Sequence, residues 1–177
     1  CYQLYTSGTT GLPKGVELTN RNFFGMLAAM SKAWSFDSES VNLVAMPLFH
    51  IAGSGWGFAG AFNGGTNVLL RDVNPAEILA LIQEHRITNA LLVPAVFQFL
   101  LATPGIENTD FSSMRSIVYG ASPITEDVLV GIMRATGRPV LQVYGLTETT
   151  GAITLLSYED HDPGGPRAHL LRSAGRP

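Results

Sequence analysis

The chain has 177 residues, a formal net charge of -3, 46% hydrophobic residues and only 14% charged residues. This composition excludes an intrinsically disordered chain, which combines low hydrophobicity with high net charge. The sequence holds no cluster of Lys and Arg that would mark a nucleic-acid surface, and no apolar run of the roughly 20 residues that cross a membrane. The length fits one domain or a large part of one. The shortage of charge predicts that some apolar surface is covered by a ligand, a partner or further chain.

The two ends of the sequence lack the usual marks of a complete chain. No initiator Met precedes Cys1, and the last residue is Pro177, so we expect a fragment of a longer protein. A single cysteine and no visible signal peptide favour a cytoplasmic location. Low charge and a cut sheet edge favour a homo-oligomer, and peripheral contact with a membrane is compatible with the sequence.

Short apolar runs alternate with helix-like patterns along the chain. The runs predict strands at 1–6, 16–18, 41–46, 66–70, 90–93, 116–119, 139–143 and 152–155. The patterns between them predict helices at 19–34, 51–62, 74–86, 94–101 and 125–135. This alternation predicts an α/β fold with a largely parallel sheet covered by helices on both faces. Ligands of such folds bind beyond the carboxyl ends of the strands, here after Thr6, Met46, Tyr119 and Val143. From Ser157 onward the chain is polar, and we expect residues 157–177 to form an exposed loop.

The densest chemical signal lies in residues 5–15, Tyr-Thr-Ser-Gly-Thr-Thr-Gly-Leu-Pro-Lys-Gly. Glycines let backbone N–H groups turn toward an anion, hydroxyl groups add donors, and Lys14 adds a point charge. The segment is not a Walker A loop, because Pro13 stands where the second glycine is required and Gly15 replaces the final Ser or Thr. It therefore predicts a binding loop for a polyphosphate.

This segment resembles the signature loop of the adenylate-forming superfamily, which includes AMP-forming acyl-CoA synthetases, firefly luciferase and the adenylation domains of peptide synthetases. Three further segments resemble motifs of that superfamily in the same order: Met-Pro-Leu-Phe-His-Ile-Ala-Gly at 46–53, Tyr-Gly-Ala-Ser-Pro at 119–123, and Gln-Val-Tyr-Gly-Leu-Thr-Glu-Thr-Thr at 142–150. The resemblance runs from Tyr2 to Pro177. It implies ATP-dependent activation of a carboxylic acid to an acyl-adenylate, followed by transfer of the acyl group to coenzyme A.

The resemblance also implies a role for individual residues. The loop would hold the β- and γ-phosphates of ATP, Tyr144 would stack on adenine, Thr147 would bond the α-phosphate, and Glu148 would help to hold Mg²⁺, a hard cation suited to oxygen ligands. The implied nucleotide-binding residues are Thr6, Ser7, Gly8, Thr9, Thr10, Gly11, Lys14, Gly120, Ala121, Ser122, Tyr144, Gly145 and Thr147, and the implied catalytic residues are Lys14, His50, Thr147 and Glu148. Taken alone, Tyr144 is equally typical of a strand end and Glu148 of a helix start.

We expect the four histidines to lie in different environments and to have different roles. The resemblance places His50 where the carboxylate, the nucleotide and the acyl group meet, as a gate or an orienting group. A half-buried structural histidine is the alternative. We expect His85, His161 and His169 to lie at the surface, and no metal-ligand spacing links the four.

The acyl pocket is expected in residues 46–62, where small residues crowd between Gly53 and Ala61 and leave room beside a helix. Candidate lining residues are Trp56, Phe58, Val96, Phe97 and Phe99, although an aromatic stripe is also typical of a core. The apolar, small-residue character of the segment favours a medium- or long-chain fatty acid. An aryl acid, a dicarboxylic acid, an amino acid or a non-catalytic nucleotide-binding module are the alternatives.

The resemblance divides the chain by role within one AMP-binding domain. It predicts a phosphate loop at 5–15, the acyl-pocket region at 46–62, an adenine and Mg²⁺ motif at 119–151, and a polar tail at 157–177. The expected fold is part of the large N-terminal domain of the acyl-CoA synthetase and luciferase-like fold. The superfamily's ribose-binding aspartate, its catalytic lysine and its C-terminal domain find no match in the chain, so we expect the fragment alone to be incomplete for catalysis.

Overall fold

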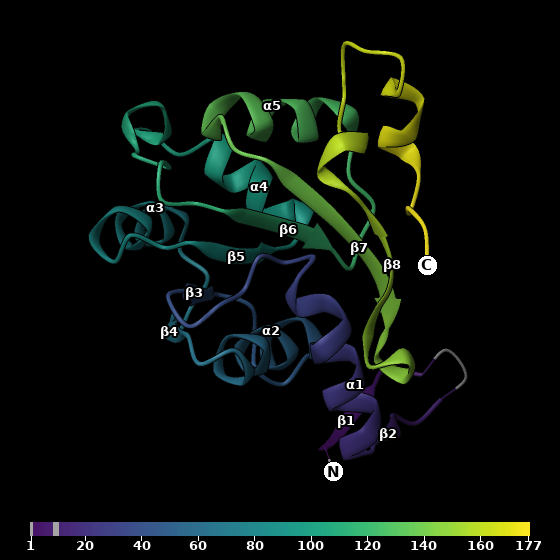
Figure 1. Cartoon of the computed structure of the whole chain (residues 1–177). Coiled ribbons are helices and arrows are strands. Elements are labelled where there is room, and N and C mark those ends of the chain that lie inside the picture. The colour runs from purple at the N-terminus through teal and green to yellow at the C-terminus, as the bar shows by residue number, and fades with distance from the viewer. Residues whose placement is uncertain (1, 9–10) are drawn as a thin grey trace.

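The main sheet is largely parallel, as the alternation of strands and helices predicts. In the computed structural model, which describes residues 2–8 and 11–177, six strands follow the order β4-β3-β5-β6-β7-β8. They are β3 (Val41–Val44), β4 (Thr66–Leu69), β5 (Asn89–Leu92), β6 (Ser116–Gly120), β7 (Val140–Leu146) and β8 (Gly151–Leu156). The strands from β4 to β7 pair in parallel, and β8 pairs antiparallel with β7. The α/β class predicted from the sequence is therefore confirmed (Figure 1).

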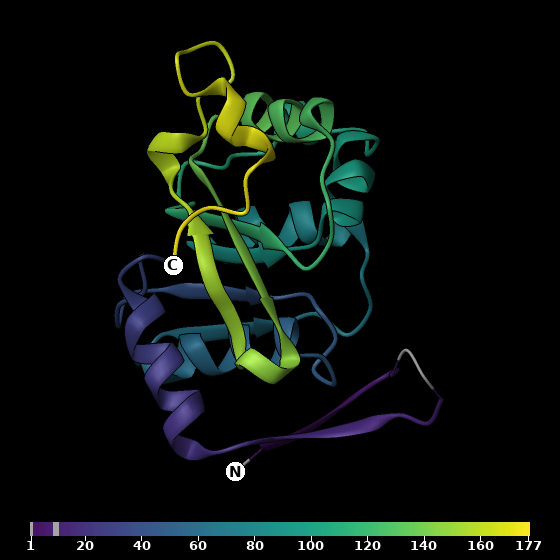
Figure 2. The same cartoon turned by 90° about the vertical axis from the view of Figure 1, so that its right-hand side faces the viewer.

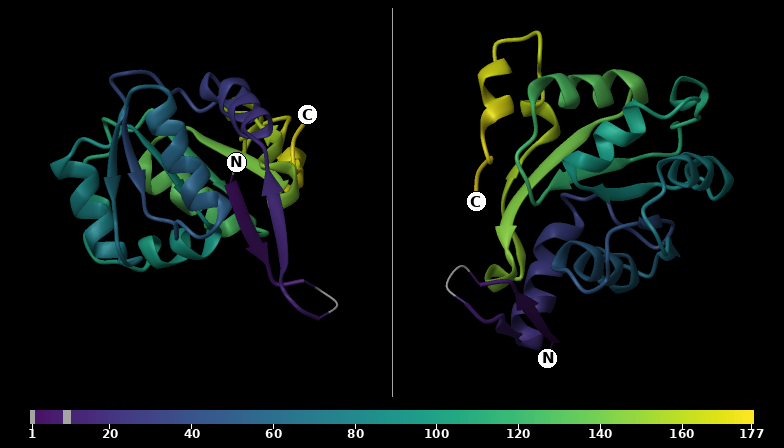
Figure 3. Two further views of the ribbon diagram at one scale, coloured as in Figure 1. Left: turned by 90° about the horizontal axis from the view of Figure 1, so that it is seen from below. Right: turned by 180° about the vertical axis from the view of Figure 1, so that it is seen from behind.

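Helices lie on both faces of this sheet (Figure 3). They are α1 (Asn20–Ser31), α2 (Ile51–Phe62), α3 (Pro75–Glu84), α4 (Pro94–Leu101) and α5 (Glu126–Thr136). α4 and α5 cover one face, and α1 and α2 cover the other. One contiguous hydrophobic core fills the space between the helices and the sheet. No helix in the described residues has both the length and the apolar character needed to cross a bilayer.

Local signals explain where these helices begin. Thr19 caps α1 in a capping box with Asn22. The Asn74 side chain accepts hydrogen bonds from the first turn of α3, whose first residue is Pro75. Thr125 occupies the N-cap position of α5, as predicted, but its side chain makes no capping hydrogen bond.

The first two strands form a separate antiparallel hairpin instead of joining the main sheet. β1 (Tyr2–Thr6) pairs with β2 (Lys14–Leu18) in a register that sets Thr6 opposite Lys14. Figure 2 shows this hairpin running below the turn that joins β7 to β8, and β2 contacts that turn. Thr6 therefore ends a hairpin strand, not a strand of the main sheet, but the hairpin still brings it to face the main sheet's strand ends.

The expectation of an exposed loop at residues 157–177 holds for only part of the tail, because Pro163, Gly164 and Pro166 are exposed whereas Asp160 and Leu171 are buried. Two short 3₁₀ helices, η3 (Tyr158–Asp160) and η4 (Ala168–Arg172), shape this tail. Arg176 pairs with Leu155 of β8 through two backbone hydrogen bonds of 2.9 Å. The Tyr158 hydroxyl lies 2.8 Å from the Ser116 hydroxyl and donates to the carbonyl of Ala33 at 3.2 Å. The tail packs against the rest of the chain because its polar side chains form hydrogen bonds with residues that lie far away in the sequence.

His161 is likewise buried, which corrects the expectation of a surface residue. Its Nε2 lies 3.0 Å from the Tyr119 hydroxyl, and its Nδ1 lies 2.7 Å from the carbonyl oxygen of Ser157. Burial lowers the pKa of the His161 imidazole and raises the pKa of the Tyr119 hydroxyl, because each charged form would lose its hydration. His85 and His169 are exposed, as predicted.

Candidate functional site

A cavity of about 710 Å³ lies between the hairpin and the strand ends of the main sheet. Its volume falls within the range of roughly 300–1,000 Å³ that is common for small-molecule sites. Predicted site residues from four separate segments line it: Thr6, Ser7, Gly8, Lys14, His50, Ala121, Gly145, Thr147 and Glu148. The fold thus brings into one cavity residues that are up to 142 positions apart, from Thr6 to Glu148.

The remaining predicted nucleotide residues lie beside this cavity or outside the described residues. Gly120, Ser122 and Tyr144 line an adjoining cavity of about 430 Å³, which shares Ala121, Gly145 and Leu146 with the first. Gly11 is exposed and lines neither cavity. Thr9 and Thr10 lie outside the described residues. A nucleotide extending from the hairpin to Tyr144 would therefore occupy both cavities.

The turn after β7 carries Thr147 and Glu148 into the cavity. This turn is the 3₁₀ helix η2 (Thr147–Thr149), and the Thr149 hydroxyl stabilises it by accepting from the Leu146 N–H at 2.9 Å. A Cβ at Gly145 would collide with the carbonyl oxygen of Gly151, so only glycine allows β7 and β8 to approach this closely. Thr149 therefore stabilises the turn, while Thr147 and Glu148 line the cavity. The sequence alone did not distinguish these roles.

His50 stands at the N-cap position of α2, and its side chain makes no capping hydrogen bond. A Cβ at Gly53 would collide with the carbonyl oxygens of Met46 and Pro47, so glycine lets the start of α2 pack onto that segment and fixes where His50 lies. The imidazole is exposed, with its ring centroid 4.5 Å from that of Phe49. The alternative of a half-buried structural histidine is therefore wrong.

Lys14 and Glu148 are the charged side chains that line the cavity, apart from the titratable His50. Both are exposed, and within residues 2–8 and 11–177 neither takes part in an ion pair. The same described part of the chain holds no group of three or more His, Cys, Asp and Glu side chains that could bind a metal. One carboxylate on the wall of this cavity fits Mg²⁺, which commonly binds through one or two carboxylates together with substrate phosphates.

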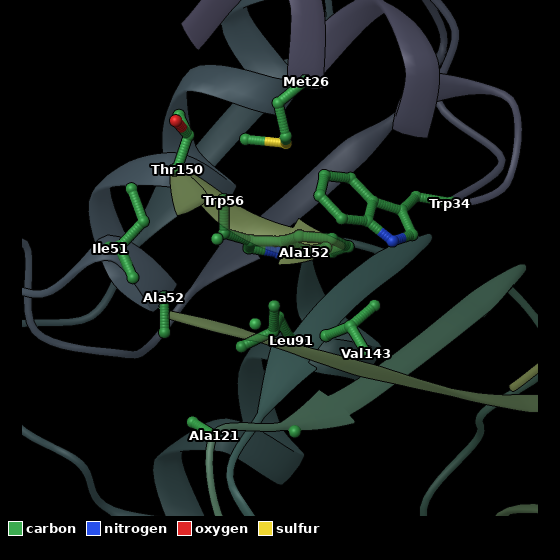
Figure 4. A pocket seen from close by; sticks show the side chains of 14 residues that line it. Met26, Trp34, Ile51, Ala52, Trp56, Leu91, Ala121, Val143, Thr150 and Ala152 are labelled. Atoms are coloured by element: carbon green, nitrogen blue, oxygen red, sulfur yellow. The ribbon is translucent and has the colours of Figure 1, made fainter. Parts of the chain in front are cut away.

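A small apolar cavity of about 70 Å³ adjoins the main one and shares Ile51, Ala52, Ala121 and Gly145 with it (Figure 4). Trp34 and Trp56 form one wall, with ring centroids 5.2 Å apart. Its other lining residues are Met26, Gly55, Leu91, Gly120, Val143, Thr150, Gly151 and Ala152. This cavity is the candidate for the acyl group.

Of the five aromatic and apolar residues predicted for the acyl pocket, Trp56 is the one that lines this candidate cavity. Phe58 lies on another face of α2, is 48% exposed and packs against Tyr2 and Phe23. Val96 and Phe97 belong to the core, and Phe99 is exposed. Met26, Trp34 and the start of β8 were missed, because no local pattern marks residues that meet only when distant segments pack together.

The main cavity lies beyond the carboxyl ends of the parallel strands, which is where α/β proteins bind their ligands. Residues 1–177 match the family described as AMP-binding enzyme, and the chain belongs to that family. It is 40% identical over 180 residues to the fatty acid–[acyl-carrier-protein] ligase ScoC of Streptomyces coeruleorubidus, covering 99% of this chain and 34% of the relative. It is 36% identical over 173 residues to the medium/long-chain-fatty-acid–CoA ligase FadD8 of Mycobacterium tuberculosis, covering 98% and 29%.

The structural comparison gives the same family. The structure of o-succinylbenzoate CoA synthetase (MenE) from Bacillus subtilis, in complex with the acyl-adenylate intermediate OSB-AMP, matches with a TM-score of 0.84 and 34% identity. The match covers 99% of this chain and 34% of that one. The resemblance to acyl-CoA synthetases, in sequence and in fold, is therefore confirmed. The chain spans about a third of the length of the curated relatives described above.

Proposed function

We propose that the protein containing these residues uses ATP to activate a carboxylic acid, forming an acyl-adenylate and then an acyl-CoA. The observation that carries this proposal is the single cavity lined by Lys14, His50, Thr147 and Glu148, with an apolar cavity opening beside it. A carboxylate, a triphosphate and a hydrocarbon group would each meet suitable side chains there. Membership of the AMP-binding enzyme family supports the same chemistry.

The proposed reaction assigns a task to each part of the site. An oxygen of the carboxylate attacks the α-phosphorus of ATP, the bond to the β-phosphate breaks, and pyrophosphate leaves. The hairpin backbone and Lys14 stabilise the charge of the departing pyrophosphate. Thr147 bonds the α-phosphate and Tyr144 stacks on adenine. Glu148 would help to hold a Mg²⁺ ion, which would offset the negative charge of the phosphates. The thiol of coenzyme A then attacks the acyl carbon, and AMP leaves.

His50 is proposed to orient the carboxylate. It lines the main cavity beside Ile51 and Ala52, which border both cavities. An acid with its hydrocarbon group in the apolar cavity would therefore present its carboxylate close to His50. Holding two reactants in position is a large part of catalysis in a reaction of this kind.

We propose a medium- or long-chain fatty acid as the substrate, supported by the apolar lining and by the relatives ScoC and FadD8. A short-chain or small aryl acid is the second candidate, because the apolar cavity measures about 70 Å³. An engineered cavity that holds benzene measures about 150 Å³. A longer chain would need Met26, a flexible side chain on the wall, to move aside.

We also propose which larger enzyme contains this site and which ligands that enzyme binds. The chain would form part of the large N-terminal domain of a cytoplasmic enzyme, and the low share of charged residues is compatible with self-association. Its ligands would be the acid, ATP, Mg²⁺ and coenzyme A.

Acid-dependent exchange of labelled pyrophosphate into ATP tests the proposal directly. The full-length protein would be assayed with acetate, butyrate, octanoate, palmitate, benzoate and cinnamate. Exchange that peaks at octanoate or palmitate supports a fatty acid, and a peak at butyrate or benzoate supports the second candidate. Binding of ATP without exchange on any acid would contradict the proposed activity and favour a non-catalytic nucleotide-binding module.

A further inference from the structure

The tail forms one wall of the cavity beside Tyr144. This cavity of about 430 Å³ has Gly120–Ile124 and Gln142–Leu146 on two sides. Leu171, Arg172, Ser173 and Ala174 of the tail supply the rest of the lining. We call residues 168–174 the wall segment. Because Tyr144 is proposed to stack on adenine, the wall segment borders the space next to the base.

One buried carboxylate ties down both ends of the wall segment. The Asp160 side chain is only 8% exposed, and its Oδ1 lies 3.2 Å from Nη1 of Arg167, directly before the segment. Its Oδ2 lies 3.7 Å from Nη2 of Arg176, two residues after the segment. The Ser157 hydroxyl donates a further hydrogen bond to the same carboxylate at 3.2 Å. Asp160 therefore forms ion pairs with one arginine before the wall segment and one arginine after it.

Further hydrogen bonds connect the region around Asp160 and the wall segment to the main sheet. His161 contacts the Tyr119 hydroxyl, and Tyr119 directly precedes Gly120 and Ala121 on the opposite side of the same cavity. At the far end, the Thr154 hydroxyl of β8 donates to the carbonyl of Ala174 at 2.6 Å. The wall segment is therefore fixed relative to the strands that carry the nucleotide residues.

We propose that Asp160 is a positioning residue for the nucleotide, which acts through Arg167 and Arg176 to hold the wall segment beside the adenine. This inference rests on the proposed function, since it assumes that the base lies next to Tyr144. Removing the negative charge would leave Arg167 and Arg176, whose side chains are 48% and 78% exposed, without the buried carboxylate that they share, so the wall segment would lose its inner anchor. The wall segment lines the cavity beside Tyr144 and not the one that holds Thr147 and Glu148, so we expect ATP binding to weaken more than the chemical step slows.

The variant Asp160→Asn in the full-length enzyme tests this inference, because it keeps the size of the side chain and removes its charge. We expect the KM for ATP to rise about tenfold, with kcat and the KM for the acid changed by less than about twofold. The matched control is Glu126→Gln, which removes the ion pair of 3.5 Å between Glu126 and Arg172, whose side chain is 85% exposed, on the outside of the same wall. Exposed pairs contribute little, so the control should keep all three constants.

Two further measurements make the outcome decisive. The dissociation constant of ATP, measured by calorimetry, should rise in Asp160→Asn even if no acid supports turnover, which separates this inference from the proposed reaction. If Asp160→Asn does not fold, Arg167→Gln and Arg176→Gln each remove one tie and should each weaken ATP binding by a smaller factor. A folded Asp160→Asn protein with the wild-type affinity for ATP, or unchanged affinity in both arginine variants, would overturn the inference.

Discussion

Buried His161 makes the stability of the domain depend on pH in a way that can be calculated. Its Nδ1 faces the Ser157 carbonyl oxygen, which can only accept, so Nδ1 carries the proton and Nε2 accepts from the Tyr119 hydroxyl. Burial lowers the pKa of this imidazole below its ordinary value, although the Ser157 carbonyl and the nearby Asp160 carboxylate oppose the shift. The neutral ring is therefore the form that the folded state stabilises.

The sign and size follow from proton linkage. The unfolded chain binds a proton near pH 6.5, and the folded state binds it only at lower pH. Stability is therefore complete above about pH 6.5 and falls as the pH drops toward the folded pKa. Between pH 7.5 and 5.5 this single group removes up to about 1.4 kcal/mol, which corresponds to a few degrees in the melting temperature.

Thermal unfolding of the full-length protein at several pH values measures this effect. His161→Gln should be less stable at pH 7.5 but should lose less stability on acidification, so its difference from the wild type shrinks toward pH 5.5. His85→Gln, at an exposed histidine on the same chain, should follow the wild-type pH dependence. If the wild type and His161→Gln lose stability in parallel, the buried neutral histidine has no part in the pH dependence and our reasoning is refuted.

Three predictions concern the proposed reaction, two in the full-length protein and one in the isolated fragment. Lys14→Ala should slow adenylation by about 10²-fold, because one electrostatic donor to the leaving pyrophosphate is lost. Lys32→Ala, at the chain's other lysine, should leave the rate of adenylation unchanged. Equal rates in the two variants would show that Lys14 does not belong to the site. Glu148→Gln should raise the Mg²⁺ concentration needed for half-maximal rate, since the amide lacks the charge that a hard cation prefers, and an unaltered Mg²⁺ titration would exclude Glu148 as a ligand. The fragment 1–177 should release no AMP from ATP with coenzyme A and fatty acids; turnover within tenfold of the parent would show that it contains the whole machinery.

The parts of the site that the sequence predicted are those encoded by local patterns. Strands alternating with helices define the sheet, and the hydroxyl, glycine and lysine residues of 5–15 mark a phosphate loop within one short segment. The fold brings nine of the predicted site residues into one cavity because they follow strands or turns that end on the same side. Patterns of this kind need no knowledge of which distant segments touch.

The parts that the sequence did not predict depend on contacts between distant segments. The tail was expected to be exposed because it is polar, yet Tyr158 reaches Ala33, which is 125 positions away, and His161 reaches Tyr119. Trp56 and Phe58 were both assigned to the acyl pocket, although residues two apart on a helix point to different faces. Composition identifies which side chains are polar or aromatic, but it does not reveal the partner that buries them.

The central claim is that ATP lies between the hairpin and the turn after β7. A structure of the full-length protein with a non-hydrolysable ATP analogue and Mg²⁺ tests it most directly. We predict the triphosphate along residues 6–14, Mg²⁺ next to Glu148, and adenine against Tyr144 with the wall segment 168–174 beside it. A nucleotide bound elsewhere, or one whose base and phosphates are reversed in this cavity, would contradict the account.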